Sequence, residues 1–595
     1  MKKFLSVLFA CLMVCTLFSG VVHANAAQAA SKISDNLSDI YSDIGGGEST
    51  LVYVEMRDVS EDAVMEEFAR RYPEEYTIYV AAKMDNLAAE LTSEDETLLD
   101  QAVMHKRQIY KEFYSESNHQ IIDRYFTEED QLFVSGYAPV AIVEASQANT
   151  WAMARSVDVL AIREVAKTEF YEAGVANPVL PNSTVITVNY VNDVALANRI
   201  SRADVLRDTY GLTGEGIRVG VIDAEGVADA SNYYLHSANI TVHPHNTTIS
   251  QHATNIVAIM AATNGENCYG MIPDAEFYCY AAKFKTEFYA GIEWFLDSGV
   301  HVINISMALY DVLGWYDSLS AWVDHIAVLH DVHCVVAAGN DVVFVSSPGM
   351  AYNAITVGSY TAYNDNVASF VMSGNSCYAE WAETYPEKPN IVAKENYGGV
   401  QGTSYAAPQV TGVIAQLCEY RPVLKYQQSA IGAILSASAA QKVEAVGAGL
   451  KGDNFISSIS GSAQISDKEG AGILDALWAW GIVANYNYAS MQLSTFPYSM
   501  TFTIDTSMNT LTRIAIFWLK RNVDCSHSGS VGQNNPAIAD LNLYVYDSSG
   551  DLVCSSTASY SNFEIVQFIP EDPAVYTIVV TGATDNLEHV GLAIW

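Results

Sequence analysis

In the middle of the chain, short apolar segments of strand length alternate with longer segments of helix length. Short apolar runs, nearly continuous as in strands buried on both faces, are separated by segments long enough to form helices. The apolar runs cover residues 217–223, 275–284, 300–307, 332–340 and 354–360. This alternation predicts an α/β fold for residues 200–484, a parallel sheet with helices on both faces.

Polar side chains stand at the carboxyl ends of three of these predicted strands. They are Asp223, Ser306 and Asn340. Open α/β sheets bind ligands at the carboxyl ends of their strands, so these residues mark the edge where a site is expected.

The regions on either side have other patterns. Residues 31–180 are charge-rich and predict a small α/β domain, with helices over 92–117 and 147–155 and strand-like stretches at 132–146 and 157–165. The two prolines within residues 177–183 indicate a linker.

After Tyr486 the helical pattern stops and short apolar runs alternate with turn residues. These runs are residues 500–505, 512–519, 541–547, 563–569 and 576–582. They predict an antiparallel β-sandwich or jelly roll. The predicted domains are therefore a leader at 1–29, a small α/β domain at 31–180, an α/β domain at 195–485 and a β domain at 490–595.

The leader has the features of a secretory signal peptide. Lys2 and Lys3 precede an apolar run over residues 4–22, and small residues in an A-x-A pattern follow at 24–29. An uncleaved membrane anchor is the alternative, and a lipid-modified Cys11 is a weaker one. No later stretch is long and apolar enough to span a bilayer, so we expect a secreted protein without a stable membrane span after cleavage.

Composition narrows the classes of partner. The chain has 30 Lys and Arg against 68 Asp and Glu, a net charge of −38, which argues against nucleic acid as a partner. Half of its 595 residues are hydrophobic, so it has ample material for packed cores. The acidic surface is interpreted chiefly as a solvated face.

Nine cysteines are too few for a disulfide scaffold, and none lies in a zinc-binding pattern. Seven remain after the leader, an odd number, so at least one stays free or pairs between chains. Cys334 and Cys418 lie in apolar runs and are expected to be buried hydrophobes. Cys525 and Cys554 form the pair to test first.

One serine has the setting of a nucleophile. Ser404 lies within residues 402–408, Gly-Thr-Ser-Tyr-Ala-Ala-Pro, directly before an apolar helix predicted over 410–417, with Pro408 expected in the first turn. Backbone donors and the positive end of the helix dipole would stabilise an oxyanion there. The alternative is that Ser404 only caps the helix.

Three further residues would complete this chemistry. His252 opens another apolar helix and could act as the base for a hydroxyl nucleophile. Asp223 could fix the tautomer of the histidine, and Asn340 could donate its amide to an oxyanion. Taken singly, His252 could be structural or solvated, Asp223 a turn or cap residue, and Asn340 another turn.

In the order Asp, His, Asn and Ser, these segments resemble the subtilisin-like serine proteases, the subtilase family. Residues 402–408 resemble that family's GTSxAAP nucleophile motif. Supporting resemblances fall in register at residues 270–284, 302–307, 388–393 and 470–479. The resemblance covers about residues 200–484.

The resemblance implies a secreted serine endopeptidase made as a zymogen. Asp223, His252 and Ser404 would form the catalytic triad, and Asn340 with the backbone N–H of Ser404 the oxyanion hole. Ser404 would form an acyl-enzyme while His252 serves as general base and then as general acid. The polypeptide substrate would pair as an added strand with residues 306–308, which are Ser306, Met307 and Ala308.

The same resemblance assigns roles to the flanking regions. Residues 133–165 resemble an inhibitory, chaperone-like propeptide, whose end would lie in the cleft until cleavage between Val165 and Ile200. Residues 541–553 resemble the β domains that follow some secreted subtilases. Catalysis would require no cofactor; a structural calcium ion would be compatible with the acidic composition, although the sequence identifies no ligands. We expect a monomer.

The chain departs from the family pattern near three of the site residues. The family's D-[ST]-G is here Asp223-Ala224-Glu225-Gly226, its H-G-T is His252-Ala253-Thr254, and Asp341 follows Asn340 in place of glycine. Together with the bulk of Met307 and Ala308, these changes indicate a narrowed or altered cleft. The second hypothesis is therefore a catalytically impaired binding or scaffold protein on a protease fold.

Overall fold

The structure is a computed structural model that divides into two compact units. The smaller unit comprises Met1–Glu67 and Gln108–Lys167, and the larger unit comprises Phe68–Arg107 and Thr168–Trp595. The residues that it describes are 29–45, 47–83, 91–165, 171–172, 190–264, 267, 269–313, 316–340, 345–360, 388–395, 401–439, 461–462, 469–504, 511–521, 539–558, 561–570, 574–583 and 588–595. The predicted leader lies outside these residues apart from Ala29.

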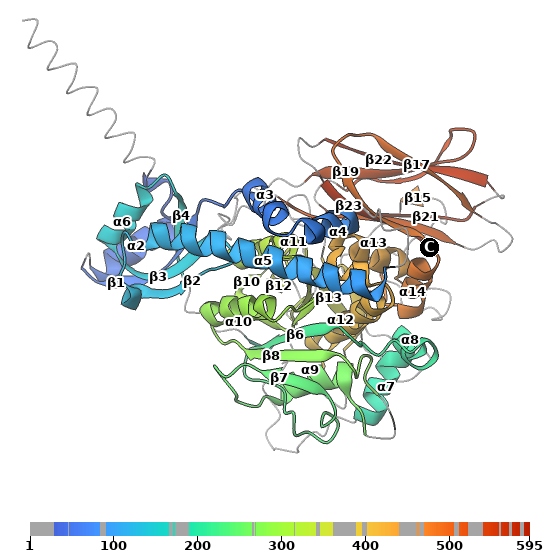
Figure 1. Ribbon diagram of the computed structural model, residues 1–595, viewed down its shortest axis with the longest axis horizontal. Coiled ribbons are helices and arrows are strands. Elements are labelled where there is room, and N and C mark those ends of the chain that lie inside the picture. Colours follow the sequence, from blue (N-terminus) through green and yellow to red (C-terminus); the bar gives the residue numbers. More distant parts are fainter. Residues whose placement is uncertain are drawn as a thin grey trace, which may run out of the picture. The chain divides into compact units, whose positions relative to one another are not determined.

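A seven-stranded sheet forms the centre of the larger unit (Figure 1). All of its described pairings are parallel, as predicted, in the order β14-β13-β11-β9-β6-β8-β7. The strands are β6 (Arg218–Asp223), β7 (Asn239–Val242), β8 (Glu276–Ala281), β9 (Val302–Ile305), β11 (His333–Ala337), β13 (Ile355–Tyr360) and β14 (Ile391–Lys394). Five of them fall within the five predicted strand segments.

The contacts made by alternate residues of β6 show that helices cover both faces of this sheet. Val219 and Val221 belong to the same apolar core as residues of α9 (Gln251–Ala261) and α12 (Thr403–Tyr420). Gly220 instead lies against the ring of Phe295 in α10 (Lys285–Asp297), where a β-carbon would come within 2.8 Å. Because successive residues of a strand point to opposite faces, Asp223 follows Val219 and Val221 toward α9.

Further helices complete the layers around the sheet. They are α7 (Tyr190–Ser201), α8 (Ala203–Tyr210), α11 (Ser318–Leu329), α13 (Gln428–Ser438) and α14 (Ala476–Ala484), with a 3₁₀ helix η3 (Pro422–Tyr426). A separate three-stranded sheet contains β10 (Met307–Leu313), flanked by β12 (Ser346–Ser347) and β5 (Tyr171–Glu172).

The C-terminal region forms two antiparallel sheets, as predicted. A five-stranded sheet has the order β15-β21-β18-β23-β16 and a four-stranded sheet the order β17-β22-β19-β20. Their strands are β15 (Gly461–Ser462), β16 (Tyr488–Leu493), β17 (Tyr498–Ile504), β18 (Thr512–Trp518), β19 (Asp540–Tyr546), β20 (Leu552–Ser556), β21 (Phe563–Phe568), β22 (Ala574–Ala583) and β23 (Glu588–Ile594). Trp518, Leu543 and Ile578 contribute to the apolar core between the sheets.

This C-terminal region shares a core with the parallel-sheet region. Phe517 and Ile565 belong to the same apolar cluster as residues of α12 and α13. Gly591 of β23 lies so close to the backbone of Ser429 in α13 that a β-carbon would collide with it, and Gly432 meets the ring of Phe517 in the same way. The two regions therefore pack as one body. The predicted boundary near residue 490 marks the change from helical to strand pattern in the sequence.

The smaller unit is a four-stranded antiparallel sheet with helices. Its order is β2-β3-β1-β4, from β1 (Ser49–Met56), β2 (Gln131–Val134), β3 (Val140–Ser146) and β4 (Val159–Glu164). The helices are α2 (Asp35–Ile44), most of α3 (Glu61–Arg71), the second half of α5 (Ser93–Ile122) and α6 (Gln147–Ala154). The division between the units falls within α3 and α5, and α4 (Pro73–Lys83) belongs to the larger unit.

Cysteine burial follows the prediction where the structure describes it. Cys334 and Cys418 are buried free thiols, and burial raises the pKa of each to about 12. Cys554 is also a buried free thiol, so it is not in a disulfide, and Cys525 lies outside the described residues. Of the helices that are described, none combines the length and apolar character needed to cross a membrane.

Candidate active site

Asp223 and His252 are hydrogen-bonded at the carboxyl end of the parallel sheet. The Oδ2 of Asp223 lies 2.6 Å from the Nδ1 of His252, and both side chains are buried. The strand parity of β6 directs the carboxylate toward α9, where His252 is the second residue. Ser250 caps that helix, its hydroxyl accepting a hydrogen bond from the N–H of Ala253, and thereby fixes the turn that carries the imidazole.

Ser404 is the second residue of α12, so the predicted helix begins earlier than residue 410. Its Oγ donates to the carbonyl of Ser306 over 3.1 Å, and its side chain is fully buried. The ring of Tyr405, the next residue, lies edge-on to the imidazole of His252 with 5.3 Å between centroids. The structure therefore brings the start of α12 next to the Asp223–His252 pair.

Pro408 is not in the first turn of its helix, as the sequence led us to expect, but in the second. A residue at this position would normally donate its N–H to the carbonyl of Ser404, four residues earlier, and proline has no N–H. The Oγ of Ser306 donates to that carbonyl instead, over 2.9 Å. Ser306 and Ser404 are thus joined by two hydrogen bonds.

Asn340 follows strand β11 at the same carboxyl edge of the parallel sheet, and a hydrogen bond to its amide oxygen fixes the side chain. Its Oδ1 accepts from the backbone N–H of Thr403 over 2.9 Å and lies 3.2 Å from the Thr403 hydroxyl. Its Nδ2 is buried and has no hydrogen-bond partner among the described residues. A buried amide donor without an acceptor is costly, so this position is suited to a group that brings an oxygen.

Two positioning residues were not identified from the sequence. The hydroxyl of Thr403 donates to the carbonyl of Gly339 and accepts from its N–H, which ties the end of β11 to the start of α12. Asn304 donates to the Oγ of Ser306 over 2.8 Å and accepts from Thr411. Thr403 is a fixed letter of the nucleophile motif, so the motif held a signal; the role of Asn304 depends on packing that no local pattern reveals.

Within residues 306–308, which the sequence predicts to bind a substrate strand, the backbone pairs with another strand of the chain. Ser306, Met307 and Ala308 are fully buried, and Met307 and Ala308 begin strand β10. Their backbones already pair antiparallel with β5, Met307 opposite Glu172 and Ala308 opposite Tyr171. An upstream segment of the chain therefore occupies this strand edge.

The departures from the family pattern leave the Asp223–His252 contact in place. The backbone N–H of Glu225 donates to the Oδ1 of Asp223 over 3.2 Å, so this segment supports the carboxylate. Ala253 is buried in the first turn of α9 beside the formed hydrogen bond. Asp341 lies outside the described residues.

Metal ligation is the other chemistry that could be sought here. Within the part of the chain that the structure describes, no three His, Cys, Asp or Glu side chains are grouped to hold a metal ion. The site described above consists of a carboxylate, an imidazole, a hydroxyl and an amide.

Comparison with known proteins places the chain in a family. The family model described as "Subtilase family" matches residues 99–472, more than half of the chain. The chain therefore belongs to the subtilase family of subtilisin-like serine proteases, and its parallel-sheet region has that family's fold.

Individual relatives match over shorter stretches. The chain is 28% identical over 228 residues to M-protease of Shouchella clausii, a match that covers 36% of this chain and 56% of that protein. It is 27% identical over 228 residues to Subtilisin Savinase of Lederbergia lenta, covering 36% and 80%. The chain thus spans little more than half the length of the first of these relatives.

Among solved structures, the chain is similar to the epidermin leader peptide processing serine protease of Staphylococcus aureus. The match is 13% identical, has a TM-score of 0.44, and covers 73% of this chain and all of that one.

Proposed function

We propose that this protein is a secreted serine endopeptidase that cleaves peptide bonds through an acyl-enzyme on Ser404. The observation that carries the proposal is the buried hydrogen bond between Asp223 and His252 at the sheet edge where α12 presents Ser404. A carboxylate that fixes an imidazole beside a serine is the arrangement required for nucleophilic catalysis by a hydroxyl.

The reaction would begin with attack of the Ser404 Oγ on a peptide carbonyl. His252 would take the hydroxyl proton and pass it to the leaving amine, while Asp223 would keep the proton on Nδ1 and stabilise the imidazolium. Water would then attack the acyl-enzyme with His252 again as base. For the first step the Ser404 hydroxyl would exchange its bond to the Ser306 carbonyl for one to the imidazole.

Asn340 and the start of α12 would stabilise the developing negative charge. The backbone N–H groups in the first turn of a helix lack the usual acceptor four residues earlier in the helix. Here the N–H of Thr403 donates to the Oδ1 of Asn340, and the N–H of Tyr405 donates to the carbonyl of Gly402. The N–H of Ser404 lies between them. Together with the Nδ2 of Asn340 and the positive end of the helix dipole, it would bind the oxyanion.

The pairing of β5 with β10 supports synthesis as a zymogen. The antiparallel register runs from Tyr171 opposite Ala308 to Glu172 opposite Met307, toward Ser306 and therefore toward the nucleophile. A peptide added in this register would be presented to Ser404 shortly after Glu172. We propose that the enzyme cleaves itself a few residues beyond Glu172, within the predicted interval from Val165 to Ile200, and that the smaller unit is the core of the propeptide.

The alternative is a scaffold protein with a spoiled site. The Asp223–His252 bond and the supported position of Asn340 favour the enzyme, because a binding protein has no physical need for a buried carboxylate–imidazole pair beside a serine. We also propose secretion and a monomeric state on the sequence features given above.

The decisive experiment compares the wild-type chain with Ser404→Ala by intact mass spectrometry during incubation. Only the wild type should shorten, and its new N-terminus should locate the processing site. Ser436→Ala, which alters a buried helical serine bonded to Gly432 in α13, is the matched control and should process normally.

An activity-directed probe separates the two functions. A fluorophosphonate should label Ser404 in the processed wild type and not in the alanine variant. Wild-type protein that does not process itself, that remains unlabelled after cleavage by an added protease and that fails to digest casein would establish the scaffold instead.

A further inference from the structure

The segment Phe68–Arg107 lies, in sequence, between strands β1 and β2 of the smaller unit, yet it is part of the larger unit. It contains α4 and the first half of α5. In the proposed zymogen it is upstream of the processing site and would belong to the fragment that cleavage detaches.

A buried carboxylate of the larger unit faces this segment. Asp331 lies in the turn between α11 and β11, and its side chain is completely inaccessible. Its backbone is in the left-handed region, with φ of 50°, a conformation that glycine adopts without strain and aspartate only at some cost. A charged residue in a buried, left-handed turn indicates that the carboxylate itself has a partner to meet.

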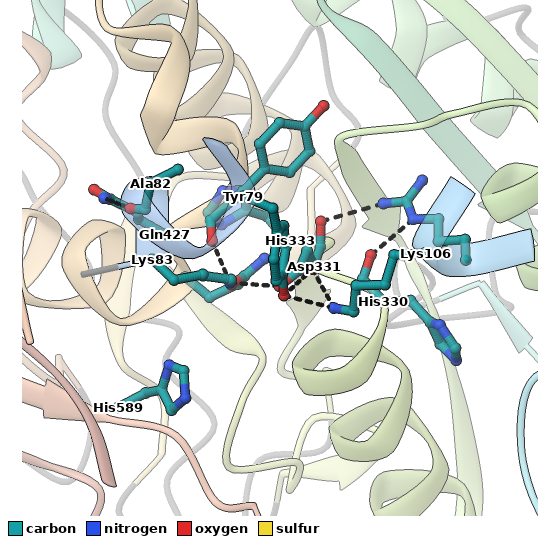
Figure 2. Close-up of polar contacts among 12 residues, drawn as sticks. Tyr79, Ala82, Lys83, Lys106, His330, Asp331, His333, Gln427 and His589 are labelled. Atoms are coloured by element: carbon teal, nitrogen blue, oxygen red, sulfur yellow. Dashed lines mark hydrogen bonds and ion pairs between the residues drawn. The ribbon is translucent and has the colours of Figure 1, made fainter. Parts of the chain in front are cut away.

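The partners are two lysines of the segment, which converge on Asp331 in Figure 2. The Nζ of Lys106 lies 2.5 Å from Oδ2, and Lys83 forms an ion pair with Oδ1. The hydroxyl of Tyr79 donates to Oδ2 over 2.9 Å and accepts from Lys106. Burial alone would raise the pKa of Asp331, but Lys106 and Lys83 outweigh it and hold that pKa well below its usual range.

The same segment satisfies backbone groups around Asp331. The guanidinium of Arg107, which is buried, donates to the carbonyl oxygens of His330, Asp331 and Val300. The carbonyls of His330 and Asp331 lie between α11 and β11, and the carbonyl of Val300 precedes β9. Without Arg107 these carbonyls would lose the guanidinium as a hydrogen-bond donor.

A second group of contacts lies near η3. Lys425 forms an ion pair with Asp100 at 3.1 Å, and the hydroxyl of Tyr426 donates to the same carboxylate over 2.8 Å. Gln427 donates to the carbonyl of Ala82. Lys83 also donates to the carbonyl of Tyr426.

We propose that Phe68–Arg107 is a permanent anchor, so that the N-terminal fragment stays bound as a non-covalent subunit after processing. Removing the fragment would take two ammonium groups and a guanidinium away from a buried carboxylate and its neighbouring carbonyls. Substitution of one partner while the segment stays docked is strongly unfavourable, because the remaining charge is then buried without compensation. This inference rests on the proposed function only in assuming that the chain is cut beyond Glu172.

The anchor is separate from the inhibitory contact. Asp331 lies at the amino end of β11, whereas β5 pairs with β10 beside Ser404. The paired end can therefore leave the site while the anchor remains, so release of inhibition does not require release of the fragment. The mature protein would consist of two chains.

The test uses a cut that does not depend on the protein's own activity. A recognition sequence for a site-specific protease is inserted within residues 177–183 of the full chain carrying Ser404→Ala, and the chain is cut by that protease. Size-exclusion chromatography and native mass spectrometry should show both fragments in one 1:1 complex. Separation of the fragments upon cutting would overturn the proposal.

Variants on the N-terminal fragment identify the cause of retention without altering the other fragment. Lys83→Met with Lys106→Met should weaken association by about 10²-fold, and Lys106→Arg should retain most of it. Lys111→Met, the same change five residues further along α5 in the smaller unit, should leave association unchanged. Circular dichroism of each full-length variant before cutting checks that the variants fold.

The outcomes also separate this inference from the proposed function. Equal affinity of the double lysine variant and the Lys111→Met control would refute a role for the Asp331 cluster, whatever the enzyme cleaves. Failure of the wild type to process itself would count against the protease and leave this result unaffected.

Discussion

The Oγ of Ser306 donates a 2.9 Å hydrogen bond to the backbone carbonyl of Ser404. It occupies the place of the N–H that Pro408 lacks, so the residue expected to bind substrate also completes the helix that carries the proposed nucleophile. Asn304 in turn fixes the hydroxyl of Ser306. The proposed substrate strand and the proposed nucleophile are therefore coupled through the buried hydroxyl of Ser306.

This coupling predicts a rescue. Ser306→Ala should lower the free energy of unfolding by about 1–3 kcal/mol, because the buried carbonyl of Ser404 loses its donor. Pro408→Ala in that background should recover part of the loss by restoring the helical N–H. Urea unfolding of the two variants and the double variant measures the coupling; strictly additive effects would show that the two donors do not serve the same carbonyl.

The Oδ1 of Asn340 is held by Thr403, whereas its Nδ2 is the proposed donor to the oxyanion, and these two roles can be tested separately. Asn340→Ala should lower kcat by about 10²–10³ through loss of the oxyanion donor. Thr403→Val removes the hydroxyl beside Oδ1 but keeps both the backbone N–H that Oδ1 accepts and the Nδ2 donor, so it should lower kcat less. Steady-state hydrolysis of a peptide substrate gives both values, and equal losses would indicate that Asn340 acts only by holding Thr403.

Asp223→Asn should lower kcat by about 10⁴, since an amide can no longer stabilise the imidazolium and favours the wrong tautomer of His252. The Oδ1 contact from the backbone of Glu225 can persist, so the fold should remain. Thermal unfolding of the variant and its kcat at neutral pH check both parts. A variant with nearly full activity would mean that Asp223 only caps the turn.

Two buried histidines make stability depend on pH. Burial lowers the pKa of His333 to about 4 and holds that of His301 well below its usual value. The unfolded chain takes up a proton on each near pH 6.5, so it binds more protons than the folded chain below that pH. The free energy of unfolding should therefore fall as the pH falls from about 6.5 to 4, by about 1.4 kcal/mol per unit for each histidine.

A substitution isolates this effect. His333→Gln keeps a donor for the carbonyl of Leu424 but does not titrate, so the slope between pH 6.5 and 4 should decrease. His236→Gln, at an exposed histidine, should leave the slope unchanged. Denaturant unfolding at several pH values provides the measurement, and an unchanged slope in His333→Gln would show that other groups dominate.

Gly591→Ala should strongly destabilise the larger unit. A β-carbon there would overlap the backbone of Ser429 in α13, and a collision with backbone cannot be relieved by a side-chain rotation. We expect loss of several kcal/mol and poor recovery of folded protein. Gly47→Ala, where a β-carbon meets nothing within 4 Å, is the control and should be nearly neutral.

Hydrophobic pattern alone predicted most of the central sheet. The segments that became β6, β8, β9, β11 and β13 were visible because strands buried on both faces are continuously apolar. Strand β7 was not predicted, since its four residues alternate between exposed and half-buried at the sheet edge. Strand β14 is equally short, and the sequence marks it only through the family resemblance of residues 388–393.

The candidate site was predictable as far as local sequence determines it. Motifs indicated Asp223, His252, Asn340 and Ser404, and the fold brings them to one edge. The support from Asn304, the position of Pro408 and the clustering of Lys83 and Lys106 at Asp331 were not predictable. Each depends on contacts between segments far apart in the chain, which no periodicity records.

The shared core between α13 and the C-terminal strands bears on the timing of activity during synthesis. The backbone of Arg513 in β18 pairs with Trp595, whose ring stacks on Trp478, and Phe517 fills the space beside Gly432. A chain still being translated lacks these strands, so the helices behind the nucleophile have an incomplete core. The proposed peptidase activity should therefore arise only after translation has passed β23.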